Sequence, residues 1–279
     1  MLKPYGYLGL VLILLAEINF SLKVMPFASW YIVIVWYGFI LFVDSLVYRI
    51  RGRSLISTYP KEFLLMILVS LPFWLIFELY NLFTLSWYYL NYVWYVHLLD
   101  FTTIVPAVLE TFSLLNALEI GKKFDRVRKA MHPQGKGKLF GVNAIRLLVV
   151  LGAIAAMVPF IAPGLGFMFI WIGLFLFLDP LSYLIGRPSV VEKVGSGTPS
   201  VLLRLFLSGI IMGLLWELWN YQAYPKWVYS FPGAASSIKL FAMPLLGYLG
   251  YLPFALEAFL FYALLRSFVF RGHNELISI

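Results

Sequence analysis

Four glutamates lie inside apolar segments of this chain, in two matched pairs. Glu78 and Glu217 each begin a Glu-x-x-Asn motif, whereas Glu110 and Glu257 each follow a proline by four residues. No Lys or Arg lies at their depth. An unpaired carboxylate in the middle of a membrane span costs on the order of 2.5–3.5 kcal/mol. We therefore expect these acids to be protonated, hydrogen-bonded or facing a polar cavity.

A neutral carboxylic acid in a dry pocket is a proton donor, which is the group that general acid catalysis needs. The alternative is structural, since Glu and Asn side chains also join helices in lipid, at about 0.6 kcal/mol per hydrogen bond. Acids inside membrane spans are functional by default, so we favour a functional site. The predicted catalytic residues are Glu78, Glu110, Glu217 and Glu257.

These glutamates belong to an internal duplication. Trp36-Tyr37-Gly38 and Asp44 precede the first Glu-x-x-Asn motif, and Trp171-Ile172-Gly173 and Asp179 precede the second. Polar positions recur as well as apolar ones, which chance similarity between apolar helices does not explain. The repeat predicts three parts: a first half at residues 1–120, a basic cytoplasmic linker at 121–141 and a second half at 142–279.

The composition is that of a membrane protein. The chain has 279 residues, of which 62% are hydrophobic and 12% charged, and its mean hydropathy is +0.89. A soluble domain averages about 25% charged residues, so the polar surface here is too small to cover a water-soluble globule. The lack of cysteine excludes disulfides and thiolate ligands, and the three histidines are scattered. We predict no metal site and no cofactor.

Apolar segments long enough to cross a bilayer occur eight times. We predict an all-α polytopic transmembrane helix bundle of about eight helices, arranged as two parallel four-helix repeats. Because prolines interrupt the last segment, its final helix is expected to start near Pro253. The predicted spans are residues 6–20, 27–47, 63–83, 101–118, 142–161, 166–184, 201–219 and 240–270.

The basic residues predict the orientation of these spans. With the N-terminus in the cytoplasm, all of the 21 Lys and Arg fall on the inner side except Lys23, Lys226 and Lys239. This asymmetry follows the positive-inside rule. We expect an integral protein of a prokaryotic cytoplasmic membrane, with both termini cytoplasmic. Four spans per half make the repeats parallel, related by a pseudo-two-fold axis along the membrane normal with a shared cavity between them.

The remaining charged and small residues have simpler interpretations. Asp44 and Asp179 lie near the cytoplasmic ends of their spans, shortly before Arg53 and Arg187. We predict structural ion pairs or helix-end contacts for them. Gly38 and Gly173 indicate close helix packing. The basic linker is a solvated loop attracted to anionic lipid, so the net charge of +8 does not indicate a nucleic-acid partner.

An aromatic, polar segment follows each Glu-x-x-Asn motif. Residues 87–96 read WYYLNYVWYV and residues 221–231 read YQAYPKWVYSF. Each ring alone suits a belt at the outer membrane interface. Together the rings would cover a cavity that contains the acids, and aromatic faces stabilise cations. The predicted substrate-binding residues are Asn81, Trp87, Tyr89, Asn220, Trp227 and Tyr229.

The tandem pattern resembles the lycopene cyclase domain family, whose repeat runs Trp-Asp-x-x-Ala, Gly-x-Trp-x-Phe and Pro-x-Glu-Glu-x-x-Phe-Phe. Here Glu stands where the family has Asp, and one acid follows each proline at the fourth position instead of a pair at the second and third. The matching positions are Phe77 to Asn81 with Trp87 and Tyr89, Trp216 to Asn220 with Trp227 and Tyr229, Pro106 with Glu110 and Phe112, and Pro253 with Glu257 and Phe259.

This resemblance implies acid-initiated rearrangement or hydration of a carotenoid or another polyprenyl chain, in a cyclase- or hydratase-like reaction. Glu110 and Glu257 would donate protons, Glu78 and Glu217 would tune or accept them, and the aromatic rings would shield the carbocation. The partners would be membrane lipid and a hydrophobic isoprenoid-like substrate. Two alternatives remain open: a proton-coupled carrier of a small apolar solute, and a non-catalytic membrane assembly or lipid-binding protein.

Overall fold

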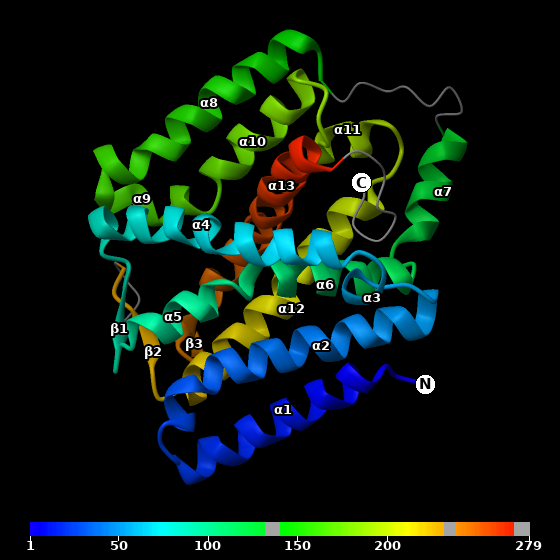
Figure 1. The fold of residues 1–279 in the computed structure, drawn as a ribbon. Helices are drawn as coiled ribbons and strands as arrows, with labels where there is room; N and C mark the ends of the chain where they lie inside the picture. Colours follow the sequence, from blue (N-terminus) through cyan, green and yellow to red (C-terminus); the bar gives the residue numbers. More distant parts are fainter. Residues whose placement is uncertain (132–139, 232–237, 271–279) are drawn as a thin grey trace.

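The computed structural model describes residues 1–131, 140–231 and 238–270 (Figure 1). Three members of the predicted cytoplasmic set of basic residues, Lys136, Lys138 and Arg271, lie outside these ranges, as does part of the predicted linker. The described chain is almost entirely helical, which confirms the all-α helix bundle.

Seven helical segments in the described ranges are long and apolar enough to cross a membrane, and a pair bent by 50° makes up an eighth. They match the eight predicted spans. The seven are α1 (Pro4–Leu22), η1 with α2 (Phe27–Trp30 and Tyr31–Arg51), α4 (Pro60–Thr84), α5 with α6 (Trp94–Phe101 and Ile104–Ala117), α8 (Val142–Ile161), α12 (Ser200–Gln222) and η2 with α13 (Leu245–Gly250 and Tyr251–Val269). The bent pair is α9 (Pro163–Ile170) with α10 (Gly173–Leu184).

The shorter elements lie at the ends of the bundle. Helix α13 begins two residues before Pro253, close to the predicted start. Two short antiparallel ribbons were not predicted, and the first of them joins the two aromatic segments. The short elements are α3 (Leu55–Thr58), α7 (Lys122–Met131), α11 (Val190–Gly195), β1 (Trp87–Leu90), β2 (Lys226–Tyr229), β3 (Lys239–Leu240) and β4 (Met243–Pro244).

Two helical hairpins flank a central group of helices. The α1–α2 hairpin lies at one edge of the bundle and the α8–α10 hairpin at the opposite edge, with α4, α6, α12 and α13 between them (Figure 1). Most of the buried side chains of the core come from α2 and these four central helices. Helices α1 and α8, on the outside, bury few of their residues, as expected for helices that face lipid.

Glycines set the close packing within each hairpin. A Cβ atom on Gly9 would lie 2.5 Å from the carbonyl oxygen of Gly38, and one on Gly38 would lie 2.8 Å from that of Gly9. In the other hairpin, a Cβ atom on Gly152 would lie 2.3 Å from the backbone of Leu176, and one on Gly173 2.8 Å from that of Ala156. The packing role predicted for Gly38 and Gly173 is therefore confirmed.

The register of the β1–β2 ribbon has a local two-fold symmetry. Trp87 lies opposite Tyr229, and Tyr89 lies opposite Trp227. The repeat makes Trp87 equivalent to Trp227 and Tyr89 equivalent to Tyr229, so each pair maps onto the other. Tyr88 and Val228, which are also equivalent, face each other at the centre. The ribbon therefore has a local pseudo-two-fold axis through this pair, and an axis that relates the whole halves stays a prediction.

Other contacts between the two halves also occur in equivalent pairs. Trp36 packs edge-on against Trp216, with ring centroids 6.0 Å apart, and the equivalent pair, Trp171 and Phe77, stacks at 5.5 Å. Helix α4 of the first half also contacts α8 and α9 of the second. The halves therefore share one core. Their boundaries at residues 120 and 142 stay a prediction.

Candidate functional site

A small cavity between the two halves is lined entirely by aromatic residues. Its volume is about 30 Å³, enough for a water molecule or two. Its wall includes four of the six residues predicted to bind substrate. The lining residues are Trp74, Trp87, Tyr89, Trp171, Trp216, Trp227, Tyr229, Tyr251 and Phe254.

Glu78 lies on the first-half side of this cavity and bonds to its wall. Its Oε1 accepts hydrogen bonds from Tyr89 Oη at 2.5 Å, Trp74 Nε1 at 2.8 Å and Trp87 Nε1 at 3.3 Å. Trp74 stands one helical turn before Glu78, so this contact is local to α4. The other two donors come from β1, which follows α4 directly. All three donors line the cavity.

Glu217 lies on the second-half side and is fully buried. Its Oε1 accepts hydrogen bonds from Tyr229 Oη and Tyr251 Oη, both at 2.6 Å. Tyr229 also accepts one from Trp227 Nε1 at 2.9 Å. Glu217 Oε2 has no hydrogen-bond partner among the described residues. The structure therefore brings Glu78 and Glu217 to one cavity, connected to it through the rings that line it.

The two ribbon tyrosines are donors at any ordinary pH. Burial, followed by the nearby Glu78 carboxylate, raises the pKa of Tyr89 well above its usual value. Burial and Glu217 do the same to the pKa of Tyr229. Both phenols therefore stay protonated and keep donating to the glutamates.

Asn81 and Asn220 hold the ribbon and do not line the cavity. The Asn81 side chain donates to the Trp87 carbonyl oxygen at 2.8 Å and accepts from Trp87 N at 3.1 Å. Asn220 makes the same two contacts with Trp227, both at 3.0 Å. Each amide thus pairs with both backbone polar groups of a cavity tryptophan and fixes its position. These polar atoms are engaged with the backbone, and substrate contact by Asn81 and Asn220 stays a prediction.

Glu110 and Glu257 are buried outside the cavity wall. Neither carboxyl oxygen of Glu110 has a well-formed hydrogen bond among the described residues. The acidic side chain of Asp44 interacts with it. Glu257 Oε1 accepts from the backbone N–H of Phe175 at 3.2 Å, in the first turn of α10. Glu257 follows the cavity residue Phe254 by one helical turn. The four predicted acids therefore form one pair at the cavity and two separate buried positions.

The two aspartates hold the starts of short helices. Asp44 accepts from Ile56 N at 2.9 Å, beside α3, and Asp179 accepts from Val190 N at 2.6 Å and Val191 N at 3.0 Å, in α11. A carboxylate at a helix N-terminus satisfies free N–H groups and complements the helix dipole. This is the helix-end contact that was one of the two roles predicted for Asp44 and Asp179.

The arginines expected to pair with these aspartates stand at the ends of the same spans. Arg187 donates to the Ser267 carbonyl oxygen at 3.0 Å and lies 4.5 Å from the ring centroid of Phe268. Arg53 follows Gly52, the C-cap of α2. Ion pairing of Arg53 and Arg187 with the aspartates stays a prediction.

Five positions of the site were not singled out from the sequence. Trp74, Trp171, Tyr251 and Phe254 line the cavity. Gly213 makes room for Tyr251, since a Cβ atom there would lie 2.3 Å from the Tyr251 ring. Trp171 stood in one repeated motif and Phe254 in the repeated stretch from Pro253 to Glu257, but neither was predicted to bind substrate. Within the described ranges, His, Asp and Glu form no group of three that could hold a metal ion.

Comparison of the chain with protein-family models, with curated proteins and with solved structures finds no match in any of the three. The likeness to the lycopene cyclase domain family stays a prediction from the motifs alone.

Proposed function

We propose that this chain is an integral-membrane enzyme that protonates a carbon–carbon double bond of an isoprenoid chain and so starts cyclisation or hydration. One observation carries this proposal: two buried or half-buried carboxyl groups bond to the wall of a cavity whose lining is aromatic throughout. An acid supplies the proton, and aromatic faces stabilise the cation that results. The motif resemblance supports the same class of substrate.

The chemistry is balanced without a redox partner. A glutamic acid O–H gives its proton to one alkene carbon, the π electrons form the new C–H bond, and the other carbon becomes cationic. In cyclisation, a neighbouring double bond attacks this cation and the ring then loses a proton to a carboxylate. In hydration, water attacks and its extra proton goes to the carboxylate. The first product is an isomer of the substrate and the second an alcohol.

We assign the proton transfers to Glu78 and Glu217, because they are the acids bonded to the cavity wall. Glu110 and Glu257 are not in contact with the cavity and receive no direct role in the reaction. Since the cavity holds only a water molecule or two, the chain end of an isoprenoid enters by displacing aromatic side chains. This exclusion of bulk water protects a carbocation from unwanted capture.

The experiment is an incubation of the purified protein with an acyclic carotenoid in D₂O. We expect a cyclised or hydrated product that carries one deuterium at carbon for each end group converted, detected by mass spectrometry. Glu78→Gln/Glu217→Gln is the matched inactive variant. Absence of product from the folded wild-type protein, with no polyene in its lipid extract, would overturn the enzyme assignment. Solute-dependent proton uptake into liposomes without conversion would favour the carrier.

A further inference from the structure

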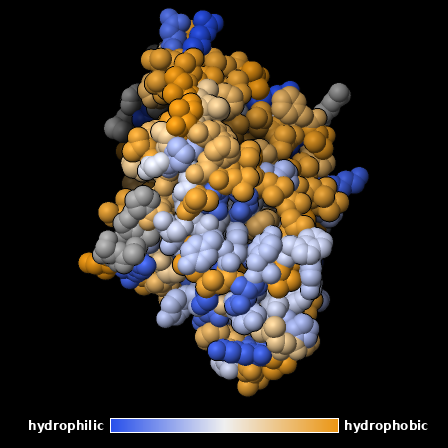
Figure 2. Space-filling model, turned by 90° about the vertical axis from the view of Figure 1, so that its left-hand side faces the viewer, coloured by the Kyte–Doolittle hydropathy of each residue, from blue (hydrophilic) through white to orange (hydrophobic). Residues whose placement is uncertain are grey.

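The three lysines predicted for the outer face gather around two adjoining pockets. Lys23 and Lys226 line the first, and Lys226 and Lys239 line the second. Tyr221 belongs to both walls. Figure 2 views this end of the bundle and shows hydrophilic residues gathered over its lower half, below a hydrophobic upper half. The few basic residues at this end are therefore concentrated at one place.

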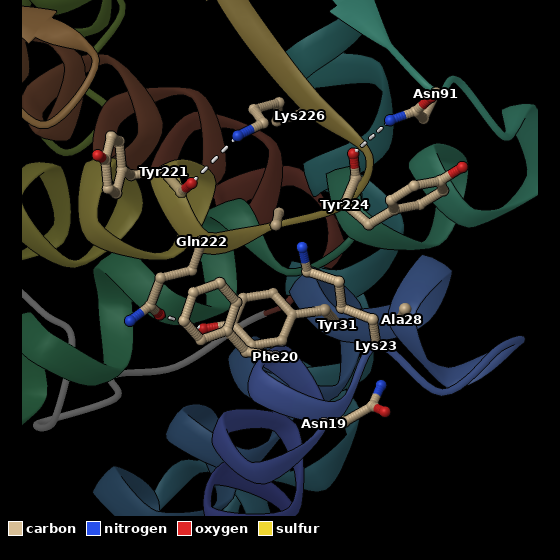
Figure 3. A pocket seen from close by; sticks show the side chains of 11 residues that line it. Asn19, Phe20, Lys23, Ala28, Tyr31, Asn91, Tyr221, Gln222, Tyr224 and Lys226 are labelled. Atoms are coloured by element: carbon tan, nitrogen blue, oxygen red, sulfur yellow. Dashed lines mark hydrogen bonds between the residues drawn. The ribbon is translucent and has the colours of Figure 1, made fainter.

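The first pocket lies where four segments meet (Figure 3). These are the C-terminal end of α1, the start of η1, the junction of α12 with β2, and Asn91 after β1. Its volume is about 220 Å³. The Asn91 side chain donates to the Tyr224 carbonyl oxygen at 3.0 Å and so ties the end of β1 to this junction. The pocket thus has walls from both halves of the chain.

The charge in these walls has one sign. Neither pocket has an Asp or Glu among its lining residues. Lys226 Nζ donates to the Tyr221 carbonyl oxygen at 3.2 Å. Lys23 Nζ has no hydrogen-bond or ion-pair partner in the described parts of the chain. A hollow lined by one sign of charge concentrates the field and attracts counter-ions.

Glu17 contacts one residue of the pocket wall but is not itself among the lining residues. Glu17 Oε1 lies 3.1 Å from Tyr31 Oη and accepts from Trp219 Nε1 at 3.2 Å. Tyr31 stands in the pocket wall, and its hydroxyl also lies 2.5 Å from Gln222 Oε1. The lining of the pocket therefore offers no carboxylate to Lys23 and Lys226.

We infer that this pocket binds the phosphate-type anionic group of an amphiphile, with Lys23 and Lys226 as its counter-charges. The anion lies between the two ammonium groups. The rings of Phe20 and Tyr221 contact the first apolar atoms of the ligand. Two sources share this chemistry, an anionic phospholipid headgroup and free phosphate. The inference does not depend on the proposed enzyme activity.

Ligand-induced thermal stabilisation of the detergent-purified full chain tests this site. The probes are dihexanoyl phosphatidylglycerol, dihexanoyl phosphatidylcholine and inorganic phosphate, each titrated at constant ionic strength. We expect phosphatidylglycerol to raise the Tm in a saturable way and phosphatidylcholine not to. A saturable rise with phosphate alone assigns the site to a free anion, and a rise that needs the acyl chains assigns it to lipid.

The variants decide whether the lysines are responsible. Lys23→Gln is expected to weaken binding about fivefold, and Lys23→Gln/Lys226→Gln about 20-fold or more, from the value of one lysine near an anionic headgroup. Lys61→Gln/Lys193→Gln removes two charges at the opposite end of the bundle and should leave binding unchanged. Lys23→Gln leaves the ribbon intact, so it remains informative if the double variant misfolds. Equal stabilisation by both lipids, or unchanged binding in Lys23→Gln and the double variant, overturns the inference.

Discussion

The two half-sites around the aromatic cavity differ at positions that the repeat makes equivalent. Four residues before the glutamate stands Trp74 in the first half and Gly213 in the second. Trp74 donates to the glutamate of its own helix, whereas Gly213 leaves room for the ring of Tyr251, which donates from α13. The position equivalent to Tyr251 in the first half is Ile104. One hydrogen-bond donor thus comes from the glutamate's own helix in the first half and from a neighbouring helix in the second.

This exchange makes two chemically identical acids unequal. Glu217 is fully buried, and its Oε2 has no hydrogen-bond partner in the described ranges. Glu78 is only half-buried and receives three donors on one oxygen. Two acids in different surroundings are how one site obtains a donor and an acceptor. We expect Glu217 to be the main donor.

The largest expected effect is on turnover. Glu217→Gln should reduce carotenoid conversion by about 100-fold or more, because a general acid contributes about 10²–10⁴-fold. Glu78→Gln should reduce it by about tenfold. Gln keeps a carbonyl oxygen for the phenols, so both variants should fold. Deuterium incorporation in D₂O measures the rates. Equal losses in the two variants would contradict the assignment of unequal roles.

The next largest effect is on stability, at Gly213, where the two half-sites differ in residue type. Gly213→Ala places a Cβ atom 2.3 Å from the Tyr251 ring, and overpacking of this kind costs about 2 kcal/mol. Unfolding of the detergent-purified protein in SDS measures the change. Gly164→Ala is the matched control, since a Cβ atom there meets nothing within 4 Å. A Gly213→Ala variant as stable as this control would show that Tyr251 can move aside.

A smaller effect should be shared by the halves. Asn81→Ala and Asn220→Ala each remove two hydrogen bonds to the backbone of a cavity tryptophan, which should cost about 1–2 kcal/mol in unfolding free energy. Asn143→Ala, at an exposed position, is the control. If only one of the two variants were destabilised, the hydrogen bonds of Asn81 and Asn220 would not contribute equally to stability.

The smallest effects should again differ between the halves. Tyr89→Phe removes one donor to Glu78, which should cost about 1 kcal/mol. Tyr229→Phe removes a donor to Glu217 and also leaves Trp227 Nε1 without its acceptor, so its cost should be greater. Exposed Tyr88→Phe is the control, and the Tm of each variant is the measurement. A larger loss in Tyr89→Phe would reverse the predicted order.

The sequence predicted the spans well because each is a long apolar run with clear ends. It also predicted the packing role of Gly38 and Gly173, since small residues allow helices to approach in lipid. The β1–β2 ribbon escaped prediction because its strands come from segments far apart in the chain, and such pairing depends on the whole fold.

Only some of the residues that line the cavity could be predicted from the sequence. Trp87 and Trp227 stood out because they recur after the Glu-x-x-Asn motifs. Trp74 and Phe254 did not, since an aromatic residue in an apolar helix has the same pattern whether it faces lipid or a neighbour. Asn81 was predicted to meet substrate because a polar residue beside an acid suggests a site. Its amide hydrogen-bonds to the backbone of Trp87, a contact that the sequence does not reveal because it depends on how β1 folds back toward α4.

The β1–β2 register has the form of an isologous contact, in which the same patch on both partners pairs with itself. In a dimer of identical chains, each contact across the axis would occur twice, the residue on the axis would meet its own copy, and any substitution would change both sides. Here both strands belong to one chain, so Tyr88 faces Val228. Since the two halves are not identical copies, equivalent positions can also hold Trp74 in the first half and Gly213 in the second. Because both strands belong to one chain, a site with local two-fold symmetry can hold two glutamates in different surroundings.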